Sequence, residues 1–469
     1  MKVKFCGAAQ FVTGSSHLIT LDDGYKILLD CGLFQGKGRH IWDYNNNWNF
    51  TPADIDCLIL SHAHIDHTGR VPKLVKDGFT GDIHCTHATR SLCTIMLLDS
   101  AKIQERDVEW HNKKILKKRK KDLSKIRTPL YTSENVTPTL DLFIGYNYNR
   151  WHRINEKVSV MFKDAGHILG SSSVTLKITE NGKERLVGFT GDIGRPDRPI
   201  LRNPQQMPKV EYLICESTYG DKDHQLPPEQ SEEFLNILKE TCIEKKGKLV
   251  IPAFSVGRTQ EIVYMLDRLE TAGLLPKLPI YVDSPLAVNA TMIFGQHPEC
   301  FDNELNEYLL IDDNPFGFND LNYIRDVKDS KALNDTDEPC VIISSSGMMN
   351  AGRVKHHLFN NIENPKNTFL IVGYCSPSTP GGMLRDGVES IKLFGEWKMV
   401  KADVKVMDSF SAHGDRNEMH DFISNQTDVK KIFLVHGELD RQEKWKAFLN
   451  EKGFRDVEIP AEGDEYDLS

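Results

Sequence analysis

The sequence lacks any apolar run of the about 18–20 residues needed to cross a bilayer. It also lacks the apolar stretch of a secretory leader, because polar residues appear within the first ten positions, MKVKFCGAAQ. No internal repeat, low-complexity tract or long linker interrupts its 469 residues. We therefore expect a globular protein of the cytoplasm with no membrane partner.

Paired cysteines are missing as well. The ten cysteines are scattered, and none forms the CxxC spacing of a zinc ribbon or a redox site. In a cytoplasmic chain such residues are expected to be small buried apolar groups without disulfides. A metal site would therefore have to use carboxylates and some of the 17 histidines.

A net positive charge is also absent. The 58 basic and 67 acidic residues give a net charge of −9, so bulk charge does not hold this chain to nucleic acid. The exception is residues 113–127, which hold nine Lys or Arg and one Asp. This basic run is either a solvated helix face or a contact for RNA phosphates, and the sequence leaves both open. No KH or zinc-knuckle motif indicates a separate RNA-binding module.

The order of the apolar segments predicts two α/β bodies. Short strands dominate up to about residue 216, with a hairpin turn at Asn181-Gly182 and a long helix leading toward the basic run. From there, strands and helices alternate to about residue 390, which implies a parallel sheet covered by helices. At about 150 residues per domain the length allows two or three domains, and two bodies fit this pattern better.

The strongest chemical signal is Ser61-His-Ala-His-Ile-Asp-His67, directly after the apolar strand CLIL. Three histidines and one aspartate lie within this short loop, and a loop leaving a strand can aim several side chains at one point. Imidazole and carboxylate ligands suit a borderline cation such as zinc. An accidental cluster in a polar loop is the weaker interpretation.

Other His and Asp residues occur beside Gly where further apolar strands end. They lie in the segments Asp164-Ala-Gly-His167, Thr190-Gly-Asp192, SAHGD with His413, and LVHGE with His436. Each of these taken alone is typical of a structural residue at a strand end. As a set, they favour one common site with the HxHxDH loop.

These motifs resemble the metallo-β-lactamase superfamily and, within it, the β-CASP nucleases, which include bacterial and archaeal RNases and the mRNA 3′-end processing endonuclease. HxHxDH is shared with other hydrolases, whereas Glu216 in CESTYG, His413 and His436 resemble the three β-CASP signatures. The resemblance implies an α/β fold, a metallo-β-lactamase αββα sandwich with an inserted α/β β-CASP domain. The metallo-β-lactamase domain would comprise residues 1–216 and 396–469, and the β-CASP domain residues 217–395.

The same resemblance implies two zinc ions per chain. The ligands carried over are His62, His64, His167 and Asp192 for one ion, and Asp66, His67, His436 and the bridging Asp192 for the other. Asp30 would orient the ligands without binding metal. His413 would act as a general acid or phosphate donor, with its tautomer fixed by Glu216. Asp66, Glu216 and His413 are thus the expected catalytic residues.

Two loops of the inserted segment precede helices, where free backbone N–H groups can bind phosphates. The predicted contacts to substrate phosphates are Ser255, Arg258, Ser345, Ser346, Gly347 and Arg353. A plain turn followed by a helix cap is the alternative for each loop.

The resulting hypothesis is a zinc-dependent ribonuclease that hydrolyses single-stranded RNA with a hydroxide activated by two metals. Cleavage would be endonucleolytic, with 5′ exonucleolytic action left open. The alternatives are a DNA nuclease, a small ester or thioester hydrolase of the same fold, and a non-catalytic RNA-binding subunit. The 2′-OH distinguishes RNA from DNA, and no single residue reports on it. A homodimer is also left open.

Overall fold

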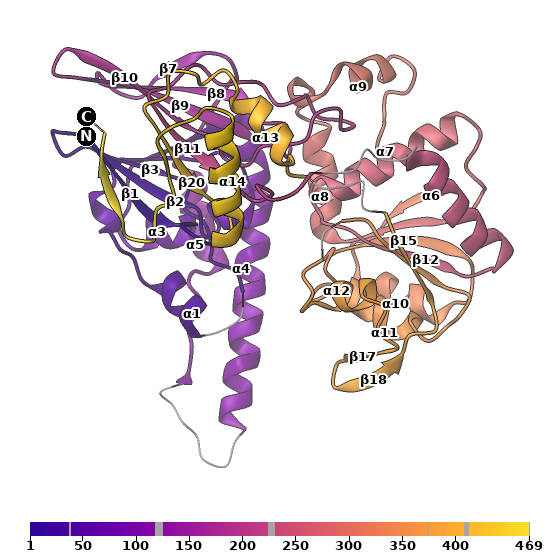
Figure 1. The fold of residues 1–469 in the computed structure, drawn as a ribbon. Helices are drawn as coiled ribbons and strands as arrows, with labels where there is room; N and C mark the ends of the chain where they lie inside the picture. The colour runs from indigo at the N-terminus through magenta and orange to yellow at the C-terminus, as the bar shows by residue number, and fades with distance from the viewer. Residues whose placement is uncertain (37–38, 118–124, 224–229, 374, 408–411, 469) are drawn as a thin grey trace. The chain divides into compact units, whose positions relative to one another are not determined.

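The computed structural model describes residues 1–36, 39–117, 125–223, 230–373, 375–407 and 412–468. The chain forms two compact units, one of Met1–Asp223 with His413–Ser469 and one of His224–Ala412 (Figure 1). Among the described residues, no helix combines the length and the apolar character needed to cross a membrane. Residues 118–124 of the basic run lie outside the described residues.

The first unit contains two seven-stranded sheets. The strand order of the first sheet is β22 (Glu465–Asp467), β1 (Lys2–Gly7), β2 (Ser16–Thr20), β3 (Lys26–Leu29), β4 (Cys57–Ile59), β5 (Asp82–Thr86) and β6 (Phe143–Tyr146). The order of the second is β21 (Val457–Glu458), β20 (Lys431–Val435), β11 (Tyr212–Glu216), β10 (Lys183–Phe189), β9 (Ser172–Glu180), β8 (Val158–Asp164) and β7 (Trp151–Arg153).

The two sheets share one apolar core. Every second residue of β8 is buried, as expected for a strand with one face turned inward. Val160 and Phe162 of this strand belong to the same core cluster as Phe5 and Ile27 of the first sheet. All ten cysteines are buried and free, as the sequence predicted.

Helices cover the outer faces of this sandwich. On the second sheet, α13 (Arg416–Ile423) and α14 (Leu439–Glu451) pack through an apolar cluster that includes Met419 and Trp445. On the first sheet, α4 (His87–Leu116) contacts β5 and β6. The remaining helices are α1 (Arg39–Asn46), α2 (Ile65–Thr68), α3 (Val71–Lys76) and α5 (Ser133–Leu140). The predicted αββα sandwich is confirmed.

The predicted hairpin is confirmed too. It joins β9 to β10 through Asn181 and Gly182, whose φ angles of 50° and 73° are those that a two-residue type I′ turn requires.

The second unit is built on a six-stranded sheet in which every neighbouring pair is parallel, as the alternating pattern predicted. Its order is β14 (Leu321–Tyr323), β13 (Ile280–Asp283), β15 (Cys340–Ser344), β12 (Lys248–Pro252), β16 (Thr368–Ile371) and β19 (Asp403–Val406). Its helices are α6 (Gln230–Leu238), α7 (Arg258–Thr271), α8 (Pro285–Phe294), α9 (Asn303–Tyr308), α10 (Val327–Asp335), α11 (Val354–Asn361) and α12 (Pro380–Arg385).

The units divide the chain later than the expected boundaries after residues 216 and 395. The position after residue 395 falls inside a hairpin of β17 (Ser390–Leu393) and β18 (Glu396–Met399). Further on, β19 pairs with β16, and Val404 and Val406 pack against the core of the second unit. Because a strand belongs to the sheet that binds its backbone, the second unit extends to Ala412.

Candidate metal centre

Four strands of the second sheet bring their carboxyl ends to one edge. β10, β11 and β20 are parallel neighbours, and β8 points the same way because β8 and β10 both pair antiparallel with β9. The loops or ends of these strands carry His167, Asp192, Glu216 and His436. The topology thus explains why residues far apart in the sequence meet.

The HxHxDH loop reaches the same edge from β4 of the first sheet. Its Ser61 carbonyl oxygen accepts hydrogen bonds from the backbone N–H and the hydroxyl of Ser172 in β9, both at 2.9 Å. His64 precedes the short helix α2, which carries Asp66 and His67. The two sheets are therefore joined where their metal-binding side chains converge.

The potential ligand atoms of the described residues form three groups, each within 4.8 Å, and the third combines Asp192, Glu216 and His436. The first group contains His62, His64, His167 and Asp192, and the second contains Asp66, His67 and His436. The structure thus brings together all seven residues predicted to bind metal.

Asp192 lies between the first two groups and turns one carboxylate oxygen toward each. Its Oδ2 is 3.4 Å from the Nε2 atoms of both His62 and His167. Its Oδ1 is 3.3 Å from His67 Nε2 and 3.7 Å from His436 Nδ1. This Oδ1 is buried and has no hydrogen-bond partner among the described residues. A buried carboxylate oxygen facing imidazole nitrogens fits a divalent cation, so the residues present suit the metal that the fold implies.

Asp30 binds the HxHxDH loop on the side away from the ligand groups. Its carboxylate accepts hydrogen bonds from the Ser61 N–H at 2.8 Å and the Ser15 hydroxyl at 3.1 Å, and lies 2.7 Å from His67 Nδ1. The contact leaves His67 Nε2 pointing at Asp192. Asp30 therefore sits where a residue that orients ligands must sit.

Sequence reasoning missed Thr218 and Ser15. The Thr218 hydroxyl lies 3.0 Å from Nδ1 of His436, which leaves Nε2 facing His67 and Asp66. Thr218 belongs to the CESTYG motif, so its place two residues after Glu216 was a usable signal. Ser15 carried no such signal, because only the fold places β2 beside Asp30.

Glu216 and His413 form a pair at the margin of the centre. His413 Nδ1 is 3.3 Å from Glu216 Oε2, and His413 Nε2 is 3.9 Å from Asp192 Oδ2. Glu216 is fully buried and its Oε1 accepts a hydrogen bond from the Ile193 N–H, whereas the His413 side chain is 20% exposed. An isolated bridge to Gly194 places the His413 backbone beside the Asp192 loop.

Burial and the carboxylates divide the histidines by protonation. Burial lowers the pKa of His64 to about 4 and also holds the pKa of His62 well below its usual value. Burial opposes the charged form of His67 too, but the Asp192 and Asp30 carboxylates raise its pKa well above the usual value. For His413, the carboxylates of Glu216 and Asp192 outweigh the effect of burial and raise the pKa to about 9.

The predicted phosphate contacts lie in the second unit. Two of the serines share a hydrogen-bonding partner, and both arginines form ion pairs with acidic residues. The Ser255 and Ser345 hydroxyls lie 3.2 and 2.8 Å from that of Ser284, at the carboxyl ends of parallel strands. Arg258 is buried against Glu261, and Arg353 Nη1 donates to Asp283 at 2.6 Å. The Ser346 hydroxyl donates to Asn350, and Gly347 packs near Phe254.

Comparison with known families gives three matches along the chain. Residues 9–122 match the metallo-beta-lactamase superfamily and residues 259–384 match the Beta-Casp domain. Residues 397–460 match the Zn-dependent metallo-hydrolase RNA specificity domain. The matches fall in the same order as the resembling motifs.

Curated relatives are similar over nearly the whole chain. Ribonuclease TTHA0252 of Thermus thermophilus is 33% identical over 94% of this chain and 94% of its own length. An RNase J-like protein of Methanocaldococcus jannaschii is 30% identical over 93% and 92%. The transcription termination factor FttA of Methanosarcina mazei is 31% identical over 93% of this chain and 67% of its own length.

Replacing Gly32 by alanine should disturb the centre. The added Cβ would lie 1.6 Å from the Asp66 carbonyl oxygen, so α2 and its ligands would have to move. We expect a loss of about 1–3 kcal/mol in the free energy of unfolding, as for other overpacked sites, together with weaker metal binding. Denaturant unfolding and metal titration measure the two effects. Gly373→Ala is the control, because its added methyl group meets nothing within 4 Å; equal behaviour of the two variants would refute the packing argument.

Metal binding near neutral pH should release protons from His67. A ligand nitrogen must be unprotonated, so the raised pKa of His67 means that affinity increases as pH rises toward that value. His64, with a pKa of about 4, should add no dependence above that pH. Titration calorimetry in buffers of different ionisation enthalpy counts the protons. Asp30→Asn, which removes a charge that raises this pKa, should release fewer; the same count from both proteins would contradict the assignment.

Proposed function

The chain belongs to the β-CASP family of the metallo-β-lactamase superfamily, and on that premise we propose that it is a zinc-dependent ribonuclease with two ions per chain, hydrolysing single-stranded RNA. Its family makes it a metal-dependent hydrolase. The observation that carries the two-ion proposal is Asp192, which turns one oxygen to each ligand group. RNA as the substrate is supported by the relatives named as ribonucleases and by the match to an RNA specificity domain.

The proposed ligands of the two ions are the first two observed groups. His62, His64 and His167 would hold one ion, Asp66, His67 and His436 the other, and Asp192 would contribute to both. When bound, two such ions lower the pKa of a shared water and neutralise charge that builds on a phosphate oxygen. Neutral His62 and His64 present unprotonated nitrogens without first having to lose a proton.

His413 is the proposed proton donor to the departing oxygen of the RNA. Its ring faces the centre through Nε2, and its raised pKa keeps a proton on the ring at neutral pH. Glu216 accepts at Nδ1 and is itself fixed by the Ile193 N–H, so the ring cannot turn freely. Bound cations would repel the imidazolium and bring its pKa closer to neutrality, where donation is most efficient.

We also propose that the loops of the second unit bind phosphates of the RNA backbone. Ser255, Ser345 and Ser346 are half-buried with hydroxyl groups near the strand ends, and Gly347 directly follows Ser346. Arg258 and Arg353 would shape these loops through their ion pairs with Glu261 and Asp283.

The direct test compares labelled single-stranded RNA and DNA oligonucleotides of the same sequence, with zinc and with a chelator. We expect RNA cleavage that the chelator abolishes and zinc restores, with internal fragments appearing early. Preferential cleavage of DNA would contradict the proposal and indicate a DNA nuclease. Binding of RNA without cleavage, in a protein shown to contain zinc, would favour a non-catalytic subunit.

Asp192→Ala should lose most of both metal ions because its carboxylate faces both groups. His62→Ala should weaken chiefly the site that it shares with His64 and His167. Elemental analysis of the purified proteins gives the metal content per chain. Asp421→Ala, which removes a side chain that is 83% exposed, is the control and should keep two ions. An active protein that contains no metal would end the proposal.

His413→Ala should keep both ions and lose turnover by about 10²–10⁴-fold, the usual contribution of a positioned acid. Glu216→Gln should show a smaller loss in the same direction. Single-turnover cleavage and metal analysis check both effects. His420→Ala is a matched control, since its side chain is 21% exposed against 20% for His413. If His413→Ala loses an ion as His436→Ala does, His413 is a ligand and not a proton donor.

A further inference from the structure

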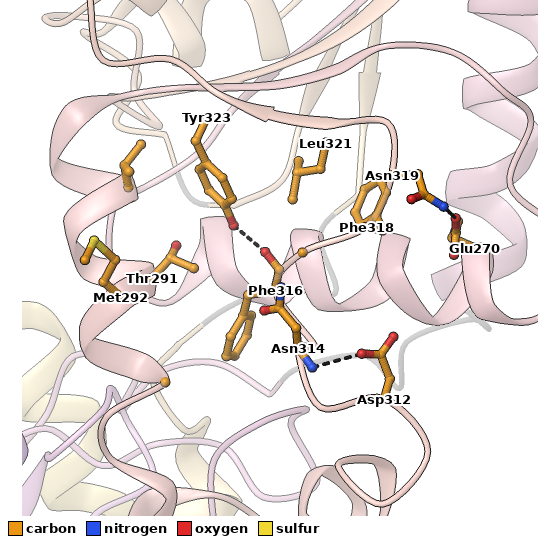
Figure 2. Close-up of a pocket in the computed structure, with 13 residues that line it drawn as sticks. Glu270, Thr291, Met292, Asp312, Asn314, Phe316, Phe318, Asn319, Leu321 and Tyr323 are labelled. Carbon is orange, nitrogen blue, oxygen red and sulfur yellow. Dashed lines mark hydrogen bonds between the residues drawn. The ribbon is translucent and has the colours of Figure 1, made fainter.

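The second unit contains a pocket of about 700 Å³ that the proposed nuclease chemistry does not use. Its walls come from α7, α8, the loop that leads into β14, and β14 itself. They combine apolar side chains with polar ones: Val288, Met292, Phe316, Phe318, Leu321 and Tyr323 on one hand, and Glu270, Thr291, Asp312, Asn314 and Asn319 on the other (Figure 2). The Tyr323 hydroxyl donates to the Phe316 carbonyl oxygen at 2.6 Å and so fixes the loop. Pockets of this size and lining bind ligands or large side chains.

Two carboxylates belong to the polar part of the pocket walls. Asp312 accepts a hydrogen bond from the Asn314 N–H at 2.9 Å, and Glu270 accepts one from the Asn319 amide at 3.2 Å (Figure 2). Each bond uses one carboxylate oxygen, so each group has a second oxygen for a ligand.

The surrounding sequence is strongly acidic. From residue 278 to residue 324 the chain has eight Asp or Glu and no Lys or Arg. Lys277 and Arg325 flank this stretch in the sequence. Arg325 donates to Asn289 and to the Met292 sulfur, and Arg268 of α7 is paired with Glu304. The local excess of acidic residues favours a cationic ligand.

Exposed apolar side chains continue the surface of the pocket. Met292 is 59% exposed, and Leu310 and Ile311, which directly precede Asp312, are 88% and 75% exposed. Exposed apolar side chains next to a partly apolar pocket indicate a surface that another molecule covers. The occupant should therefore be both apolar and cationic.

The chain carries a surface of that chemistry on α4. Between Lys102 and Lys114 no residue of this helix is fully buried, and Figure 1 shows this end running beyond the sheets of its own unit. Trp110 is 66% exposed and Leu116 is 46% exposed. Lys114 lies 5.1 Å from the centre of the Trp110 ring, so the apolar group and a cation are presented together.

We propose that the pocket binds the end of α4 from a second copy of this chain, with Trp110 inserted between the aromatic walls. Lys114 and Lys117 then face Asp312 and Glu270. Each copy carries both surfaces, so one copy can bind another through this contact. The proposal goes beyond the nuclease function and uses none of its residues.

The test is sedimentation velocity of the full chain over a range of protein and salt concentrations. We expect a dimer that weakens as salt rises, because the contact includes exposed ion pairs. Trp110→Ser, and separately the pair Asp312→Lys and Glu270→Lys, should each weaken association by at least about tenfold. Asp386→Lys with Glu389→Lys makes the same charge change outside the pocket and should leave association unchanged. RNA cleavage by the monomeric variants should persist, which separates this test from that of the nuclease.

A charge exchange makes the assignment specific. Lys114→Glu with Lys117→Glu should also give a monomer, and a chain carrying these changes together with Asp312→Lys and Glu270→Lys should associate again. A wild-type chain that is monomeric throughout, or a dimer unaffected by these variants, would overturn the proposal.

A labelled peptide of residues 108–117 gives an independent result. It should bind the Trp110→Ser chain, and a version with its three lysines replaced by glutamate should not. If the lysine peptide binds a wild-type chain that stays monomeric, the pocket binds a basic segment of another protein. That result would contradict the proposal that a second copy occupies the pocket.

Discussion

The carboxylate of Asp192 imposes the central constraint on this structure. It is buried, its Oδ1 has no hydrogen-bond partner among the described residues, and both oxygens face imidazole nitrogens at 3.3–3.7 Å. A buried carboxylate in that position is costly unless cations compensate its charge. The strands, the HxHxDH loop and the outer hydrogen bonds are arranged around this requirement.

Two of the non-glycine residues with positive φ angles lie at this site. Asp30 and His436 adopt positive φ angles of 56° and 55°, a conformation that residues other than Gly rarely take. Asp30 is held by Ser61 and Ser15, and His436 by Thr218 and by a hydrogen bond from its N–H to the Ala8 carbonyl oxygen. Strained residues persist where surrounding contacts determine them, and such positions concentrate at functional sites.

Much of this architecture was predictable because it is local in the sequence. HxHxDH, the Gly-flanked His and Asp residues and the Asn181-Gly182 turn each express their chemistry within a few positions. The parallel sheet of the second unit followed from the alternation of strands and helices. Their convergence on one centre needed either the family resemblance or the topology, since the residues come from two different sheets.

What could not be predicted depends on contacts across the fold. Ser15 directly precedes β2, and it reaches Asp30 only because β2 pairs with β3, which ends just before Asp30. In the sequence, Arg258 and Arg353 look like free positive charges. Only the folded loops show that they form ion pairs with Glu261 and Asp283. The second unit ends where it does because β19 pairs with β16. This pairing is long-range, and no local sequence pattern in residues 396–412 predicts it.

The most direct measurement is an anomalous difference map at the zinc edge from crystals of the purified protein. The account predicts two peaks about 3.5–4 Å apart with the Asp192 carboxylate between them, one beside His62, His64 and His167 and the other beside Asp66, His67 and His436. A single peak among Asp192, Glu216 and His436, whose ligand atoms also lie within 4.8 Å of one another, would contradict it.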